Sequence, residues 1–306
     1  MRSHPEPLSR RRFVAAGAVT AGAVLLGACS SGDDDEATTD TSDGDGPASS
    51  GSGDYSLIPF LNDKVLAAGA MSRVPFALAD ADGLLPTDQL PEALEVSVLD
   101  RTNGRSSNAV RVPRHDDGLE RAYFPLELTF DQPGVYTLQT EYEGAPAELS
   151  VQAYPESEIR LIRGGVAMPP LETPTVTDAR GVDPICTREP ACPLHDVTVA
   201  RALQAGQPLA LLIATPAFCQ ITICGPVLDI LLDGMGAHPG ITYLHAEVYT
   251  QPQVSLESFA PAVTELALPQ EPVLLLVGAD GVVRERIDVI FDRVELDDKL
   301  AALRDA

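Results

Sequence analysis

Short runs of alternating apolar and polar residues occupy much of the chain between residues 55 and 155. Alternation with a period of two places the apolar side chains on one face of a strand. The runs are 73–78, 94–99, 123–130, 134–138 and 147–151, with turn signals such as Asp82-Gly83, Asn103-Gly104 and Asp117-Gly118 between them. The pattern therefore predicts an all-β domain over residues 55–155.

One turn in this region carries a recognisable tyrosine. The stretch 131–136 reads Asp-Gln-Pro-Gly-Val-Tyr, which resembles the tyrosine corner of immunoglobulin-like sandwiches, where the phenol bonds back to the chain. The resemblance implies an immunoglobulin-like β-sandwich; a core Tyr136 without the corner bond is the alternative. His115 lies in a polar loop and is expected to be solvated. Nothing here indicates chemistry, so we expect a spacer or an interaction module.

Residues 156–306 alternate strand and helix patterns instead. Helices are predicted over 198–205, 226–235, 256–266 (interrupted by Pro261) and 294–303, and strands over 209–214, 241–249, 273–277 and 282–290. The runs 209–214 and 273–277 are wholly apolar, which is typical of strands buried on both faces. A βαβ unit, a hairpin and a final helix predict a C-terminal α/β domain.

A cysteine pair follows the first of these strands. Cys219 precedes Cys224-Gly225-Pro226 by five positions, and Glu271-Pro272 precedes a second apolar strand. These features resemble the thioredoxin-like superfamily over about residues 198–306, although the family usually has Trp where Phe218 stands. The resemblance implies redox cysteines at 219 and 224 and a cis-proline at Pro272. An ordinary strand-entry proline is the alternative.

The spacing of this pair departs from the family, which has two residues between its cysteines rather than four. Five steps along a helix rise about 7.5 Å, beyond the roughly 4.4–6.8 Å that a disulfide allows between Cα atoms. Cys219 must therefore lie in a loop that curls back over the helix start. Either cysteine matches the attacking one, and the helix dipole favours Cys224 as the more acidic thiol. A permanent disulfide is the structural alternative.

A second pair, Cys186 and Cys192, lies in a proline-rich stretch that continues to His195. Beyond Cys29 the chain has four cysteines. If the chain is exported, as its N-terminus indicates (below), an even number indicates disulfides, so a structural bridge is the leading interpretation. A regulatory bridge and a metal site of Cys186, Cys192 and His195 remain open, although the spacing fits no common zinc module.

His245 offers a different metal hypothesis. Copper chaperones of the Sco type share the thioredoxin-like fold and use two cysteines with a distant histidine, which suits soft metals. The corresponding set here is Cys219, Cys224 and His245. A packed or edge-strand histidine is the alternative for His245, and His238 is expected to lie in a turn.

The N-terminus indicates export. Arg10-Arg11-Arg12-Phe13 before a short apolar stretch resembles a twin-arginine signal, and Leu26-Gly27-Ala28-Cys29 resembles a lipobox. We expect an export signal over 1–28, lipidation at Cys29 and a disordered acidic linker over 29–54. An uncleaved membrane anchor is the alternative. The whole architecture resembles actinobacterial lipoproteins of this kind.

Charge limits the partners. The chain carries −24, and residues 1–28 hold four Arg and one Glu, so the remainder carries −27. That balance argues against nucleic acid and against adhesion to anionic lipid. We expect a lipid-anchored protein on the extracytoplasmic face of the cell membrane, without a cofactor, that acts on exported protein thiols or a redox partner.

Three functions remain open from the sequence. The first is a thiol–disulfide oxidoreductase or redox partner that uses Cys219 and Cys224. The second is a metal-binding chaperone, and the third is a structural lipoprotein whose disulfides only stabilise its fold.

Overall fold

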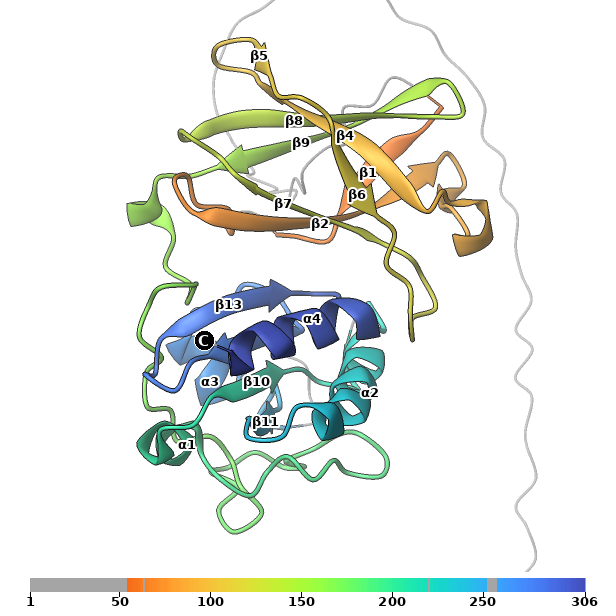
Figure 1. Cartoon of the computed structure of the whole chain (residues 1–306). Coiled ribbons are helices and arrows are strands. Elements are labelled where there is room, and N and C mark those ends of the chain that lie inside the picture. The colour runs from red at the N-terminus through yellow and green to blue at the C-terminus, as the bar shows by residue number, and fades with distance from the viewer. Residues whose placement is uncertain (1–53, 63, 220, 252–257, 306) are drawn as a thin grey trace, which may run out of the picture. The chain divides into compact units, whose positions relative to one another are not determined.

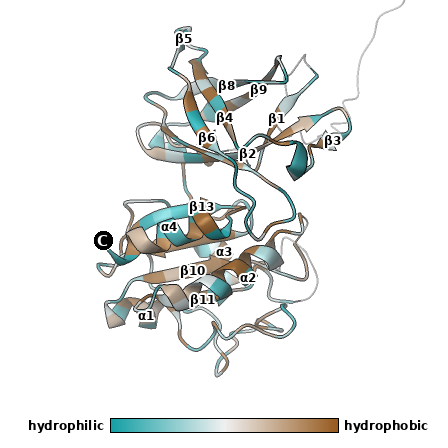
Figure 2. Cartoon of the chain, turned by 45° about the vertical axis from the view of Figure 1, so that its right-hand side comes forward, coloured by the Kyte–Doolittle hydropathy of each residue, from teal (hydrophilic) through white to brown (hydrophobic). Residues whose placement is uncertain are grey.

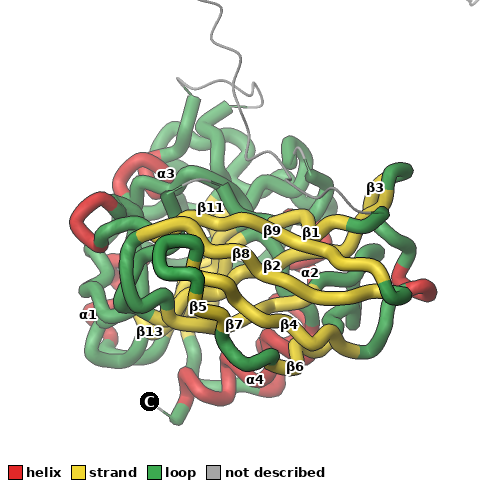
Figure 3. Tube along the Cα trace, turned by 90° about the horizontal axis from the view of Figure 1, so that it is seen from above, coloured by secondary structure: helices red, strands yellow, loops and turns green. Residues whose placement is uncertain are grey.

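The computed structural model describes residues 54–62, 64–219, 221–251 and 258–305 (Figure 1). The predicted export signal, Cys29 and the linker up to residue 53 lie outside this part of the chain. Strand residues outnumber helical ones, as Figure 3 shows. The described residues fall in one compact unit, Gly46–Ala306. No helix among them is both long and apolar enough to cross a membrane.

The region that was predicted to be all-β consists of strands packed in two layers. The strands are β1 (Ser56–Pro59), β2 (Met71–Asp80), β3 (Gly83–Leu84), β4 (Ala93–Asp100), β5 (Arg105–Ser106), β6 (Val110–Pro113), β7 (Phe124–Thr129), β8 (Gly134–Tyr142) and β9 (Ala145–Ala153), with 3-10 turns at Thr87–Gln89 and Glu156–Glu158. One sheet joins β1, β2 and β3 with β7 on β2, and another joins β5, β4, β8 and β9 with β6 on β4. Both sheets contribute buried residues to one apolar core, among them Phe76, Phe124, Val96 and Leu138.

The tyrosine-corner bond is present. The Tyr136 hydroxyl donates to the Gln132 carbonyl at 2.8 Å, and the Gln132 N–H donates back at 3.3 Å. The alternative of a tyrosine without a corner bond is therefore wrong. This bond fixes the turn that leads into β8.

The second half of the chain surrounds a further sheet. Its elements are α1 (Val199–Ala205), β10 (Leu209–Ile213), α2 (Cys224–Gly234), a 3-10 turn (Met235–Ala237), β11 (Thr242–Ala246), α3 (Pro261–Glu265), β12 (Val273–Val277), β13 (Val283–Asp288) and α4 (Arg293–Arg304). The strand order is β11-β10-β12-β13, parallel between β10 and β11 and antiparallel elsewhere. Apolar clusters cover both faces of the sheet, and β10 and β12 are apolar and buried throughout. The hydrophobic colouring of β10 can be followed in Figure 2.

Most predicted elements of this half are present with shifted ends. The Thr198 side chain caps α1 by accepting the Arg201 N–H. Helix α2 begins at Cys224 rather than at Pro226, so the second cysteine belongs to the first turn. Helix α3 starts only at Pro261, where the fixed φ of proline suits a first helical position.

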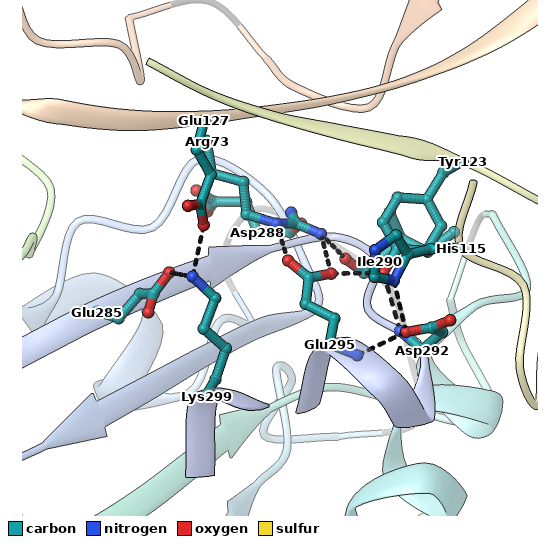
Figure 4. A network of polar contacts seen from close by, with 10 residues as sticks. All are labelled: Arg73, His115, Tyr123, Glu127, Glu285, Asp288, Ile290, Asp292, Glu295 and Lys299. Atoms are coloured by element: carbon teal, nitrogen blue, oxygen red, sulfur yellow. Dashed lines mark hydrogen bonds and ion pairs between the residues drawn. The ribbon is translucent and has the colours of Figure 1, made fainter. Parts of the chain in front are cut away.

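A buried polar network connects β2 with α4 (Figure 4). Arg73 donates to both carboxylate oxygens of Glu295, at 2.5 and 2.7 Å, and both side chains are about 5% exposed. Tyr123 also donates to Glu295. His115 contacts Asp292 at 2.8 Å through Nδ1, and its side chain is only 12% exposed. The expectation that His115 is solvated was therefore wrong, because α4 packs over its loop.

Candidate functional site

The cysteine pair at 219 and 224 lies at the connection between β10 and α2. The Cys224 N–H donates to the Cys219 sulfur at 3.3 Å, so the intervening loop curls back over the helix start, as the spacing predicted. Thr222 supports the reversal with a left-handed φ of 57°. Cys224 is fully buried, whereas Cys219 is partly exposed.

The two thiols differ in acidity. The pKa of Cys219 is lowered to about 6, chiefly because the Cys224 thiol donates to its sulfur and further because backbone N–H groups, including that of Cys224, point at it. Burial raises the pKa of Cys224, and its bond to Cys219 raises it further. The preference for Cys224 as the more acidic thiol was therefore wrong. The looped-back sulfur of Cys219, rather than that of Cys224, lies at the N-terminus of α2.

A carboxyl group completes this site. The Cys224 sulfur also lies 3.9 Å from Glu271 Oε2, which is a second acceptor within reach of its thiol proton. Burial raises the pKa of Glu271 to about 8, with a further contribution from the negative charges of Cys219 and Glu247. The peptide bond to Pro272 is cis, as the resemblance implied. Sequence reasoning treated Glu271 only as part of a motif, although an acidic residue at the entry of a wholly apolar strand was a usable signal.

Cys219 opens onto a cavity of about 390 Å³. Its lining includes aromatic and aliphatic side chains and the Glu271 carboxyl; among them are Phe60, Val248, Tyr249, Phe259, Val263 and Leu268. One wall comes from the segment after β1. There the Asn62 N–H donates to Gln270 Oε1 at 2.7 Å and the Asn62 amide donates to the Pro269 carbonyl at 2.9 Å. The all-β region, to which the sequence assigned no chemistry, thus shapes access to Cys219.

His245 lies with the other cysteine pair. Its Nδ1 is 3.4 Å from the Cys192 sulfur, 3.8 Å from that of Cys186 and 3.3 Å from His195 Nε2. All four side chains are at most 6% exposed. The set of Cys219, Cys224 and His245 that a Sco-type chaperone would need is therefore not assembled among the described residues. His238 ends a 3-10 turn, as expected, and bonds Asp297 at 2.7 Å.

The cysteines of the described residues are all thiols in this structure. The pKa of Cys186 is lowered because the Cys192 thiol donates to its sulfur, and the pKa of Cys192 is raised by the same bond. The predicted Cys186–Cys192 bridge stays a prediction.

Comparison with known proteins adds no relative: no family model matches the chain, and no curated protein matches it either.

Proposed function

We propose that this protein exchanges thiols and disulfides, with Cys219 as the attacking sulfur and Cys224 as its resolving partner. The observation that carries the proposal is the asymmetry of the pair: an accessible, acidic thiol beside a buried one of raised pKa. The order β10-α2-β11-β12-β13-α4 and its strand pairings agree with a thioredoxin-like domain. An immunoglobulin-like assignment for the preceding sheets is part of the same proposal.

In the reducing direction, the Cys219 thiolate attacks one sulfur of a substrate disulfide. A bond forms between Cys219 and that sulfur, the substrate S–S bond breaks, and the other substrate sulfur leaves as a thiolate. Cys224 then loses its proton and attacks Cys219. The Cys219–Cys224 disulfide forms, the second substrate sulfur leaves, and two electrons have passed to the substrate. Oxidation of a substrate dithiol is the reverse sequence.

Glu271 is suited to take the proton from Cys224. Its carboxyl oxygen lies 3.9 Å from the Cys224 sulfur. The pKa of Glu271, about 8, is closer to the pKa of a thiol than the pKa of an ordinary glutamate is. Matching the pKa of a proton acceptor to the working pH favours general base catalysis. The ionised form of Glu271 would accept the proton when Cys224 attacks.

The natural partners would be exported proteins with accessible thiols or disulfides, and the largely apolar cavity beside Cys219 would receive an unfolded or extended segment. Export by the twin-arginine route, lipid anchoring through Cys29 and a site on the extracytoplasmic face of the membrane belong to this proposal. They rest on the sequence motifs of the first 29 residues.

The test is reduction of insulin disulfides by the full chain in the presence of excess dithiothreitol. We expect Cys219→Ser to lose at least about 10³-fold in rate, because the nucleophile is gone. Cys224→Ser should accumulate a mixed disulfide on Cys219. His238→Gln, which changes a buried side chain outside both cysteine pairs, serves as the control and should retain the rate.

The reduction potential of the pair supplies an independent check. A value above about −300 mV is expected for a working pair. Full activity in Cys219→Ser, or a potential below that value, would contradict the proposal and leave a structural bridge.

A further inference from the structure

Two cysteines and two histidines from distant parts of the chain converge in the second half of the protein. Cys186, Cys192 and His195 come from the proline-rich segment before α1, and His245 comes from β11. Each residue offers one ligand atom, and these four atoms lie within 4.8 Å of one another. The convergence is buried, and no part of the thiol-exchange proposal uses it.

The hydrogen bond on the far side of His245 defines its role. Its Nε2 lies 3.1 Å from the Ala214 carbonyl, and a carbonyl only accepts, so Nε2 carries the proton. Nδ1 therefore presents a lone pair to the cluster. A ring nitrogen held by a backbone carbonyl is the usual outer support of a metal-binding histidine.

His195 points into the same space with Nε2, 3.2 Å from the Cys192 sulfur. Its Nδ1 is buried and has no hydrogen-bond partner among the described residues. Burying a ring nitrogen without a hydrogen-bond partner costs free energy. A strong metal bond at Nε2 would offset the cost of burying this ring.

The distances match one coordination geometry. Bonds of about 2.3 Å to sulfur and about 2.05 Å to nitrogen, at tetrahedral angles, separate ligand atoms by roughly 3.3 Å for N···N and roughly 3.6 Å for S···N. The observed N···N distance is 3.3 Å, and the S···N distances are 3.2, 3.4 and 3.8 Å. The atoms need little movement to bind a central ion.

We infer that Cys186, Cys192, His195 and His245 form a tetrahedral zinc site. Two thiolates balance the charge of Zn²⁺, so the occupied site is neutral, as a buried position requires. Sulfur and imidazole ligands suit zinc and exclude the oxygen-seeking Mg²⁺ and Ca²⁺. All four positions are protein ligands, so the site is closed and structural rather than catalytic.

The site would stabilise the chain that presents Cys219. The Ala217 N–H donates to Thr187 Oγ1 at 3.1 Å, and His245 bonds the Ala214 carbonyl. Thr187, from the segment that carries Cys186, and His245, from β11, thus hold the chain just before Cys219. A bound zinc ion would hold these contacts in place and would take no part in the exchange reaction itself.

The experiment is a Co²⁺ titration of the reduced, metal-free full chain, followed by displacement with Zn²⁺. We expect one equivalent to bind, with the visible d–d bands of tetrahedral Co²⁺ and a thiolate-to-cobalt charge-transfer band. The double variant Cys219→Ser/Cys224→Ser should give the same spectrum. Cys192→Ser should lose most of the charge-transfer band, and His245→Gln should bind at least about tenfold more weakly.

The matched control is His238→Gln, which removes another buried histidine outside the cluster and should leave the titration unchanged. Absence of the charge-transfer band in the wild-type chain would overturn the inference, even if a variant failed to fold. So would a band that disappears in the Cys219/Cys224 double variant. A Cys186–Cys192 disulfide in freshly isolated protein would overturn it too. Insulin reduction is measured separately, so failure of this inference is distinguishable from failure of the thiol-exchange proposal.

Discussion

The two cysteine pairs of this protein have similar spacing but different surroundings. Cys186 and Cys192 lie in the interior beside two imidazoles. Among the described residues, the group of ligand atoms within 4.8 Å of one another contains these two cysteines and two histidines and no carboxylate. Cys219 and Cys224 face a helix start, a raised-pKa carboxyl and a cavity. One pair is buried beside two histidines, while in the other pair Cys224 is buried and Cys219 is partly exposed. Neighbouring groups and access, rather than cysteine spacing, distinguish the proposed metal site from the proposed redox site.

The largest expected effect concerns the enclosed pair. A chelator that strips the zinc removes a ligand that binds only the folded chain. If free zinc stood at 100 to 1,000 times its dissociation constant, the free energy of unfolding should fall by about 2.7–4.1 kcal/mol. Thermal unfolding with and without chelator should show a lower melting temperature without zinc. The same comparison in Cys192→Ser should show no chelator effect. An identical shift in wild type and variant would break the contrast between the pairs.

A second prediction tests the carboxyl of the open pair. Glu271→Gln removes the proton acceptor of Cys224, so resolution of a mixed disulfide on Cys219 should slow by about 10²-fold. Stopped-flow measurement of that step reads it directly. Alkylation of Cys219 near pH 6 should not change, because Glu271, with a pKa of about 8, is already protonated there. A merely structural role would alter both rates together.

The third prediction is a pH profile for Cys219. With a pKa of about 6, its thiolate fraction should rise about tenfold between pH 5 and 7 and then level off, whereas an ordinary thiol would gain about 100-fold over that interval. Iodoacetamide capture followed by peptide mass spectrometry measures it. The lowered pKa also means that its contribution to stability is complete above pH 9 and lost as pH falls through 6. A rate that keeps rising to pH 9 would remove the distinction between Cys219 and a surface thiol.

The smallest expected effect links the two regions. Thr187→Ala removes the acceptor of the Ala217 N–H and should cost about 0.5–1.5 kcal/mol of unfolding free energy. Denaturant titration measures this loss. If the zinc site supports the Cys219 loop, the cost should shrink in Cys192→Ser, because the support is already loosened. Full additivity would show that the two regions are independent.

The tertiary structure decided the metal hypothesis. The sequence grouped Cys186, Cys192 and His195, and it associated His245 with Cys219 and Cys224 instead. The parallel register pairs Leu212 with His245, and the His245 N–H bonds the Leu194 carbonyl at 3.0 Å. A contact between residues about fifty positions apart depends on how a loop packs against a strand, which no local pattern specifies.

The sequence by itself determined the elements and the local geometry. Continuous apolar runs predicted β10 and β12, and the spacing of Cys219 and Cys224 required the looped-back turn, because these features depend on interactions within a few residues. Only the tertiary structure decided which sulfur is accessible, that Glu271 lies near Cys224, and that Asn62 forms part of the cavity wall. Those outcomes depend on burial and on contacts between distant segments, and both arise only when the whole chain packs.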